Sequence, residues 1–162
     1  MKISRKIWFF LTAFLFAGSL LLRAAVVPTS SQTLELKRGW NLVTLTHPIT
    51  AESALRFLAL QPMTLDADKK SYVRCTSKDE LKVGVGYWIF SPTAQPPIDL
   101  VHDRSQTSYE TADLVADWSL IGVTKESSWQ GEATDIWQWL DGCFQKISKE
   151  GLTEGNAYWV SH

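Results

Sequence analysis

The sequence predicts a mainly β protein in which two similar β-rich repeats form one antiparallel sandwich or barrel-like domain with one short helix. Two observations support this fold class. First, residues 39–43 (GWNLV) and 86–89 (GYWI) form a pair that recurs at residues 117–121 (DWSLI) and 157–160 (AYWV). Second, these runs are apolar at consecutive positions, which is typical of strands covered on both faces. An α+β sheet with the helix on one face is the alternative.

The first 25 residues predict a signal peptide. Three basic residues within the first six precede an apolar run over residues 7–22, which is the order of a secretory signal. Arg23 stands where cleavage prefers a small residue, so an uncleaved N-terminal anchor is the alternative. We therefore expect an exported protein, located in the periplasm, secreted or at the cell surface. Residues 26–33 are polar and without periodicity, and we expect them to form a disordered spacer.

The chain after the signal is long enough for one domain with a core and too short for two. We expect residues 34–162 to form a single β-rich domain made of repeat 1 (34–91), a connector (92–113) and repeat 2 (114–162). Each repeat alone would leave sheet edges open. The two repeats are therefore expected to fold as one unit.

The charge of the domain argues against a nucleic-acid partner. Residues 1–25 hold four of the 16 basic residues and none of the 17 acidic ones, so removing them leaves 12 basic residues and a formal net charge near −5. Phosphate binding needs clustered positive charge. Membrane contact is expected only through an uncleaved N-terminal segment.

Repeat 1 contains the signals for a helix and a hairpin. Thr50 can cap a helix with an apolar stripe over residues 51–58, and this helix has to end before Pro62. Residues 63–66 and 71–75 then flank a polar turn, as in a β-hairpin. Repeat 2 is shorter between its first two strands, and the missing residues are those of the helix. Residues 98–102 alternate in polarity and predict a further strand.

The repeated pattern is similar to that of a known class of proteins. Residues 39–43, a short hairpin, and residues 86–89 resemble the GWNL…GYW repeats of exported, mostly uncharacterised bacterial and archaeal surface proteins. The resemblance covers nearly the whole chain after the signal, although repeat 2 has Asp117, Ser119 and Ala157 in place of Gly39, Asn41 and Gly86. It implies a non-catalytic module of a surface protein.

The sequence offers no catalytic or metal site. It has no Gly-x-Ser-x-Gly elbow, no His-Glu-x-x-His and no phosphate-binding glycine loop. His102 and Asp103 are neighbours on a predicted strand and point to opposite faces, so they cannot form a relay. Asp66 and Asp68 lack the glycine and final acidic ligand of a calcium loop. We expect no enzyme and no cofactor.

The eight tryptophans are the strongest candidate feature. Trp40, Trp88, Trp118 and Trp159 occupy matched positions of the two repeats and are predicted to lie in the core. Three others are candidate ligand-binding residues: Trp129 in a polar loop, and Trp137 and Trp139 on one strand face. When the repeats are aligned by counting back from their Tyr-Trp pairs, Trp137 and Trp139 correspond to Asp66 and Asp68 of repeat 1. Packing in a core or a lid is the alternative role for these three.

Two cysteines follow the signal, Cys75 and Cys143. Export would place them in an oxidising compartment. A disulfide between them is one possibility there, and two buried free thiols are the alternative. The repeat alignment puts them on equivalent strands.

Two functions from different classes fit these observations. The first is an exported, non-catalytic structural or interaction module that binds a protein or another envelope component. The second is a small carbohydrate-binding module, in which Trp129, Trp137 and Trp139 stack on envelope polysaccharide. A hydrolase is a distant third. A flat, exposed tryptophan platform would favour sugar, and buried tryptophans with a separate apolar patch would favour protein.

Overall fold

The computed structural model describes residues 30–66, 68–106, 118–124 and 135–161. The predicted signal peptide, Trp129 and the segment of repeat 2 from which the helix was expected to be missing lie outside these residues. Within the described chain, no helix has the length and apolar character that a membrane crossing requires.

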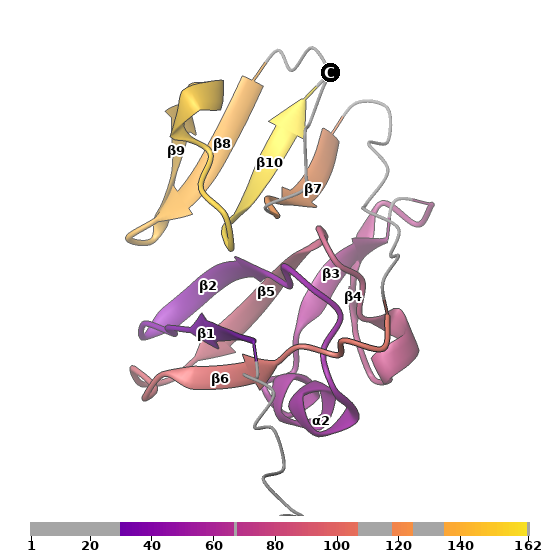
Figure 1. The fold of residues 1–162 in the computed structure, drawn as a ribbon. Helices are drawn as coiled ribbons and strands as arrows, with labels where there is room; N and C mark the ends of the chain where they lie inside the picture. The colour runs from indigo at the N-terminus through magenta and orange to yellow at the C-terminus, as the bar shows by residue number, and fades with distance from the viewer. Residues whose placement is uncertain (1–29, 67, 107–117, 125–134, 162) are drawn as a thin grey trace, which may run out of the picture.

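The described residues form two four-stranded sheets and a smaller layer, a two-stranded sheet and a helix (Figure 1). All described strand pairs are antiparallel, and the sheets are open. Within the described residues, the predicted mainly β fold with one short α-helix is confirmed, as a sandwich and not a barrel. The first sheet has the order β2 (Gly39–Thr44), β5 (Gly86–Ser91), β3 (Met63–Asp66) and β4 (Ser71–Arg74); the second has β7 (Trp118–Gly122), β10 (Ala157–Ser161), β8 (Asp135–Leu140) and β9 (Cys143–Ile147); β1 (Ser31–Leu34) pairs with β6 (Ile98–Val101).

The two sheets have the same topology, which confirms the internal repeat. In both, the last strand of the repeat lies between the first strand and a hairpin. A short 3-10 helix precedes that last strand in each repeat, η1 (Lys78–Glu80) and η2 (Lys149–Gly151). The tyrosine of that last strand, Tyr87 in β5 and Tyr158 in β10, is fully buried. Each tyrosine hydroxyl accepts a hydrogen bond from a backbone N–H five residues upstream, at 2.6 Å and 2.9 Å respectively.

The sheets meet through reciprocal contacts, as expected for a pseudo-twofold pair. Val43 of repeat 1 forms a bridge with Asn156 of repeat 2, and Val85 of repeat 1 forms a bridge with Ile121 of repeat 2. The backbone N–H of Gly122 donates to the carbonyl of Gly84 at 2.7 Å. Backbone hydrogen bonds therefore join the two repeats.

The two sheets touch at two glycines: Gly86 of repeat 1 faces repeat 2, and Gly122 of repeat 2 faces repeat 1. A Cβ atom at Gly122 would overlap the side chain of Thr44, and one at Gly86 would stand 2.5 Å from Cγ of Leu120. Any side chain at either position would push the two sheets apart. The absence of a side chain is thus a requirement of the interface, and not of the local backbone conformation.

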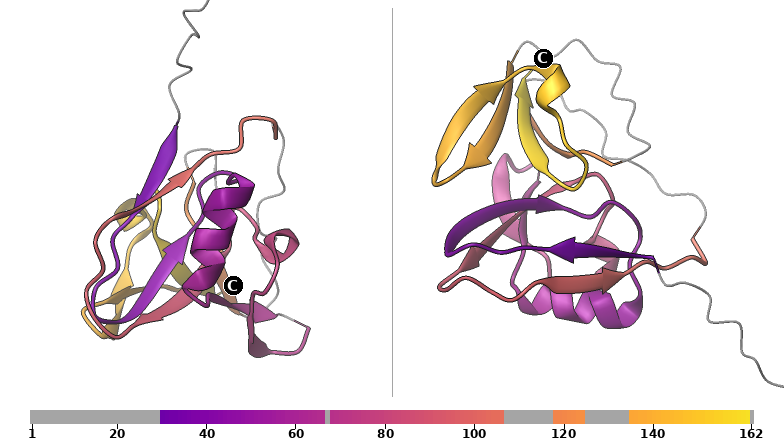
Figure 2. Two further views of the ribbon diagram at one scale, coloured as in Figure 1. Left: turned by 90° about the horizontal axis from the view of Figure 1, so that it is seen from below. Right: turned by 60° about the vertical axis from the view of Figure 1, so that its left-hand side comes forward.

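The larger aliphatic core lies on the outer side of the first sheet. Figure 2 shows α2 (Ala51–Ala59) and the β1–β6 pair covering this face. Leu34, Leu36 and Leu100 from this layer are buried with Phe57 and Tyr87, whose rings meet edge to face at 5.4 Å. The second sheet has a smaller apolar cluster around Ile121, Ile136, Tyr158 and Val160.

The spacer prediction is wrong for residues 31–33, which belong to β1. The side chain of Gln32 explains why a polar segment is held in place. Its Nε2 donates to the carbonyl of Thr44 at 2.7 Å, and its Oε1 accepts from the N–H of Thr46 at 3.0 Å. Leu34 then enters the core. The prediction rested on the polar composition of the segment, which does not reveal these tertiary hydrogen bonds.

The predicted helix and hairpin of repeat 1 are confirmed. The hydroxyl of Thr50 accepts from the N–H of Ser53 at 3.3 Å and caps α2. The helix ends at Ala59, followed by Gln61 in a left-handed conformation and then Pro62. β6 confirms the strand predicted from residue 98, although it pairs with β1, which was not expected.

The prediction that all four repeated tryptophans lie in the core is wrong for two of them. Trp88 is only 8% exposed and Trp159 is half-buried, whereas Trp40 is 45% and Trp118 46% exposed. Both exposed rings stand at or next to the start of the first strand of their repeat. There each ring meets a tryptophan of its own sheet, Trp88 or Trp159, edge to face, and leaves about half of its surface to solvent.

The close approach of the sheets gives a stability prediction. Replacing Gly122 with alanine should lower the free energy of unfolding by about 3 kcal/mol, because the new methyl group overpacks the interface. Gly151→Ala is the matched control, since its Cβ would stand 3.6 Å from Ile147, an ordinary contact. Urea unfolding followed by tryptophan fluorescence measures both. Equal stability of Gly122→Ala and Gly151→Ala would contradict this account of the interface.

Candidate functional site

The main candidate site is an aromatic cluster between the sheets, formed by Trp40, Trp88 and Phe90 of repeat 1 with Trp139 and Phe144 of repeat 2. Strand register puts these rings on the facing sides of the two sheets: Trp40 pairs with Phe90, and Trp139 pairs with Phe144. Centroid distances of 4.9 to 6.2 Å join all five rings. The cluster thus belongs to both repeats.

Trp139 packs inside this cluster and is half-buried. Its ring meets Trp88 at 5.2 Å and Phe144 at 4.9 Å between centroids, edge to face in both cases. Its Nε1 donates to the backbone carbonyl of Trp40 at 2.9 Å. The polar edge of the indole is therefore used within the protein, and the geometry favours the packing role over the ligand-binding role.

Trp137 lies on the same side of β8 as Trp139, as the sequence indicated, but that side faces the first sheet. It stands opposite Trp159 on β10 and opposite Lys146 on β9. Its Nε1 is buried and has no hydrogen-bond partner among the described residues. Trp129, the third predicted ligand contact, lies outside the described residues.

Strand register also corrects the alignment of the repeats. Trp159 stands opposite Trp137, whereas its counterpart Trp88 stands opposite Met63. The counterparts of Trp137 and Trp139 are thus Met63 and Leu65, not the aspartates predicted by counting. The hairpin loops differ in length, with residues 67–70 between β3 and β4 and only Asp141 and Gly142 between β8 and β9.

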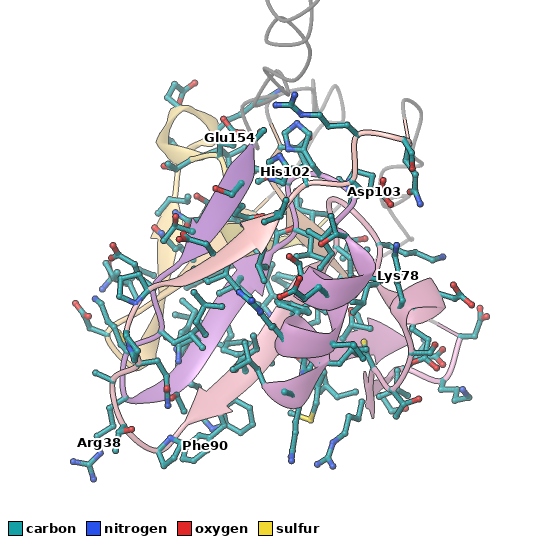
Figure 3. All side chains as sticks on the ribbon, turned by 60° about the horizontal axis from the view of Figure 1, so that its bottom comes forward. Arg38, Lys78, Phe90, His102, Asp103 and Glu154 are labelled. Carbon is teal, nitrogen blue, oxygen red and sulfur yellow. The ribbon has the colours of Figure 1, made fainter. Side chains whose placement is uncertain are left out.

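Three rings of the cluster are open to solvent. Trp40 is 45% exposed, Phe90 54% and Phe144 44%. Figure 3 shows Phe90 at the end of the molecule that also carries Arg38, away from His102. Sequence reasoning missed Phe90 and Phe144 as surface residues. For Phe90 a signal was present, since it lies two positions after Trp88 and so shares its strand face.

The rings form a corrugated surface and not a flat one. Trp40 is inclined at 61° to Phe90 and at 90° to Trp88, and Trp139 is inclined at 70° to Phe144. A sugar ring stacks on a flat aromatic face. Edge-to-face rings instead leave recesses between them, which fit a branched or aromatic side chain.

The pseudo-symmetric end of the sandwich is poorer in aromatic rings. There Trp118 and Trp159 meet at 6.1 Å, and Tyr72 is the counterpart of Phe144. Ser161 stands in place of Phe90, and Leu65 in place of Trp139. The duplication therefore does not account for Phe90 and Trp139, which make the first end aromatic.

Tyr72 links the two ends through its hydroxyl. The hydroxyl accepts a hydrogen bond from Nε1 of Trp88 at 3.2 Å. Burial raises the pKa of Tyr72, and hydrogen bonds from the side chains of Trp88 and Trp159 act against this rise. A tyrosine in this position stays neutral at physiological pH and serves as a hydrogen-bond acceptor between equivalent tryptophans.

A second location is a polar groove of about 640 Å³ between β1 and the loop before β10. His47 and His102 stack in it with their centroids 4.3 Å apart. Oγ of Ser30 lies 2.9 Å from Nδ1 of His102, which resembles the first two members of a nucleophile-base arrangement. However, Nε2 of His102 is buried and finds no partner among the described residues. No group in the described chain therefore orients this ring as a base.

The described residues hold no cluster of histidine, cysteine and carboxylate side chains able to bind a metal ion. The predicted alternative of a disulfide between Cys75 and Cys143 is wrong, because both thiols are free. Cys75 is buried in the aliphatic core, and burial raises its pKa to about 11. Cys143 is exposed on β9.

The packing role of Trp139 is testable. Trp139→Ala should cost about 3 kcal/mol of stability through the lost ring, and Trp139→Phe about 1 kcal/mol through the lost hydrogen bond to Trp40. Phe90→Ala, at an exposed ring of the same cluster, is the matched control and should cost less than either. Thermal and urea unfolding measure the three variants. A ligand platform would instead leave the stability of Trp139→Ala unchanged.

The histidine stack gives a pH prediction. Burial lowers the pKa of His102 from 6.5, His47 and Arg104 lower it further, and Glu154 opposes them. The unfolded chain then binds the proton more readily, so stabilisation by neutral His102 is complete above pH 6.5 and is lost as the pH falls through the folded pKa. His102→Gln should therefore flatten the fall in stability between about pH 7 and pH 5. An unchanged slope would exclude His102 as its cause.

Comparison with protein-family models, with curated proteins and with solved structures returned no match for this chain.

Proposed function

We propose that the protein is an exported, non-catalytic interaction module of the bacterial envelope or cell surface, and that it binds a partner protein through the aromatic cluster. The observation that carries this proposal is the exposure of Trp40, Phe90 and Phe144 together at one end of the sandwich. Trp88 and Trp139 support these rings from inside. Export is the part of the proposal that rests on the basic and apolar start of the sequence and on the resemblance to surface-protein repeats.

Exposed aromatic rings on a supported base are the usual origin of binding energy in protein interfaces. Tryptophan, tyrosine and phenylalanine are enriched there, and a few of them provide most of the affinity. Contiguous apolar patches on a monomer commonly mark interaction sites. Here the rings are held by contacts from two repeats, so the patch loses little conformational entropy when a partner binds.

The proposed partner is a protein that inserts an aliphatic or aromatic side chain between the rings. The inclined rings favour this chemistry over a sugar face, and the indole N–H of Trp139 is already bonded to Trp40. The asymmetry of the sandwich supports the same end. Phe90 and Trp139 supply aromatic rings at this end, whereas their counterparts at the other end are Ser161 and Leu65.

Site-specific photocrosslinking in cells tests the proposal. A benzoylphenylalanine in place of Phe90 should give a discrete, protease-sensitive protein adduct, because that ring lies in the proposed interface. The same probe at Leu55, which is 70% exposed on α2, is the matched control. Adding Trp40→Ala should reduce the Phe90 adduct at least fivefold. Identical adducts from Phe90 and Leu55, or none from either, would contradict the proposal.

The carbohydrate alternative has its own measurement. Titration with soluble polysaccharides and peptidoglycan fragments should leave the tryptophan fluorescence unchanged if the cluster binds protein. A saturable change that Trp40→Ala abolishes would replace the protein partner with a sugar.

A further inference from the structure

The second sheet ends in an open edge at β9. This strand is last in the order β7-β10-β8-β9, and its first four residues are exposed. Natural edge strands are commonly protected by charged side chains or proline. β9 has no proline, and its single charged residue, Lys146, forms an ion pair with Asp135 on the neighbouring strand. Among the described residues, no strand pairs with the outer side of β9.

The turn before β9 fixes which backbone groups point outward. Asp141 and Gly142 both have positive φ, 50° and 85°, as in the two-residue turn that matches strand twist. In such a hairpin the flanking pair, Leu140 and Cys143, exchanges its hydrogen bonds within the hairpin. At every second residue, beginning with the one after Cys143, the backbone N–H and C=O groups then point away from β8. Phe144 and Lys146 thus turn their N–H and C=O groups toward the open edge.

We propose that β9 pairs with β9 of a second copy of this chain, antiparallel and centred on Gln145. Each Phe144 then stands opposite the partner's Lys146, and each Cys143 opposite the partner's Ile147. The two outward residues of each strand meet those of the other, which gives four backbone hydrogen bonds across the twofold axis. The two four-stranded sheets become one sheet of eight.

The sequence of β9 is self-complementary in this register. The aliphatic stem of Lys146 covers the exposed ring of the partner's Phe144, and the ammonium group stays near Asp135. Centring the pair on Lys146 would place two ammonium groups opposite each other. Centring it on Phe144 would leave Lys146 opposite the partner's Gly142, with no ring to cover. The Gln145 register satisfies both side chains.

This dimer goes beyond the proposed function and does not depend on it. It uses the edge of β9 and shares only Phe144 with the proposed binding surface, whereas Trp40 and Phe90 lie on the first sheet and take no part. Failure of the photocrosslink at Phe90 would leave the dimer intact, and the converse also holds.

Disulfide trapping of the full chain tests the register. With Cys143→Ser in the background, Gln145→Cys should form a covalent dimer under mild oxidation, because facing residues of a non-hydrogen-bonded pair have Cα atoms about 4.5 Å apart, within disulfide reach. Lys146→Cys is the matched control, since its counterpart is the partner's Phe144. We expect at least tenfold more dimer from position 145. Equal trapping at both positions, or none at position 145, would overturn the proposal.

A second pair of variants tests the edge itself. Lys146→Pro removes an outward N–H without touching a bond to β8, and it should abolish trapping at position 145. Lys146→Gln, which keeps the N–H, should preserve it. Tryptophan fluorescence and thermal unfolding show whether both variants are folded, and a folded Lys146→Pro chain that still traps would overturn the proposal. Trapping at position 145 to a different protein would replace the second copy as the occupant.

Discussion

The contact between the two sheets at Gly86 and Gly122 is the constraint on which the rest of the structure depends. Here the sheets approach so closely that a single Cβ atom would not fit. Side chains grow with distance from this point along β2, from Thr44 through Leu42 to Trp40. Along β5, Gly86 is followed on the same face by the rings of Trp88 and Phe90. The interior is therefore a wedge that widens toward the end of the sandwich. Large rings fill the wide part, and the last of them reach solvent. The glycine contact thus leaves room for the aromatic cluster at this end.

The sequence predicted the repeat, the helix and the first hairpin, because each has a local signal. The pairing of β1 with β6 was missed, because it depends on the bonds of one glutamine side chain to β2 and the residues that follow it. Strand register was also missed. Counting back from Tyr158 assumes equal spacing in both repeats. The hairpin of repeat 1 is two residues longer, and the segment from Arg74 to Trp88 is one residue longer than that from Lys146 to Trp159, so the counterpart of Trp137 moves from Asp66 to Met63.

For the candidate site, the sequence pointed to aromatic residues but did not identify the exposed ones, Trp40, Phe90 and Phe144. The tryptophans that are not matched in the repeats attracted attention, yet Trp139 is held inside by its bond to Trp40. The exposed rings of Trp40 and Phe90 come from a strand pair that is apolar on both faces. A pattern of this kind indicates that other elements pack on both faces of the strands. Hydrophobicity alone cannot show at which residue along a strand this packing stops.

The position of β10 has a consequence for when the chain can fold. β10 is the last described strand in chain order, but it lies between β7 and β8 in the second sheet, and Asn156 just before it bridges back to Val43. The second sheet therefore cannot close until residues 157–161 have arrived, and contacts so distant in sequence form slowly. In a chain emerging from the ribosome, the second sheet stays open until β10 is made. For the export proposed above, which requires an unfolded chain, this topology delays the closure that would prevent passage.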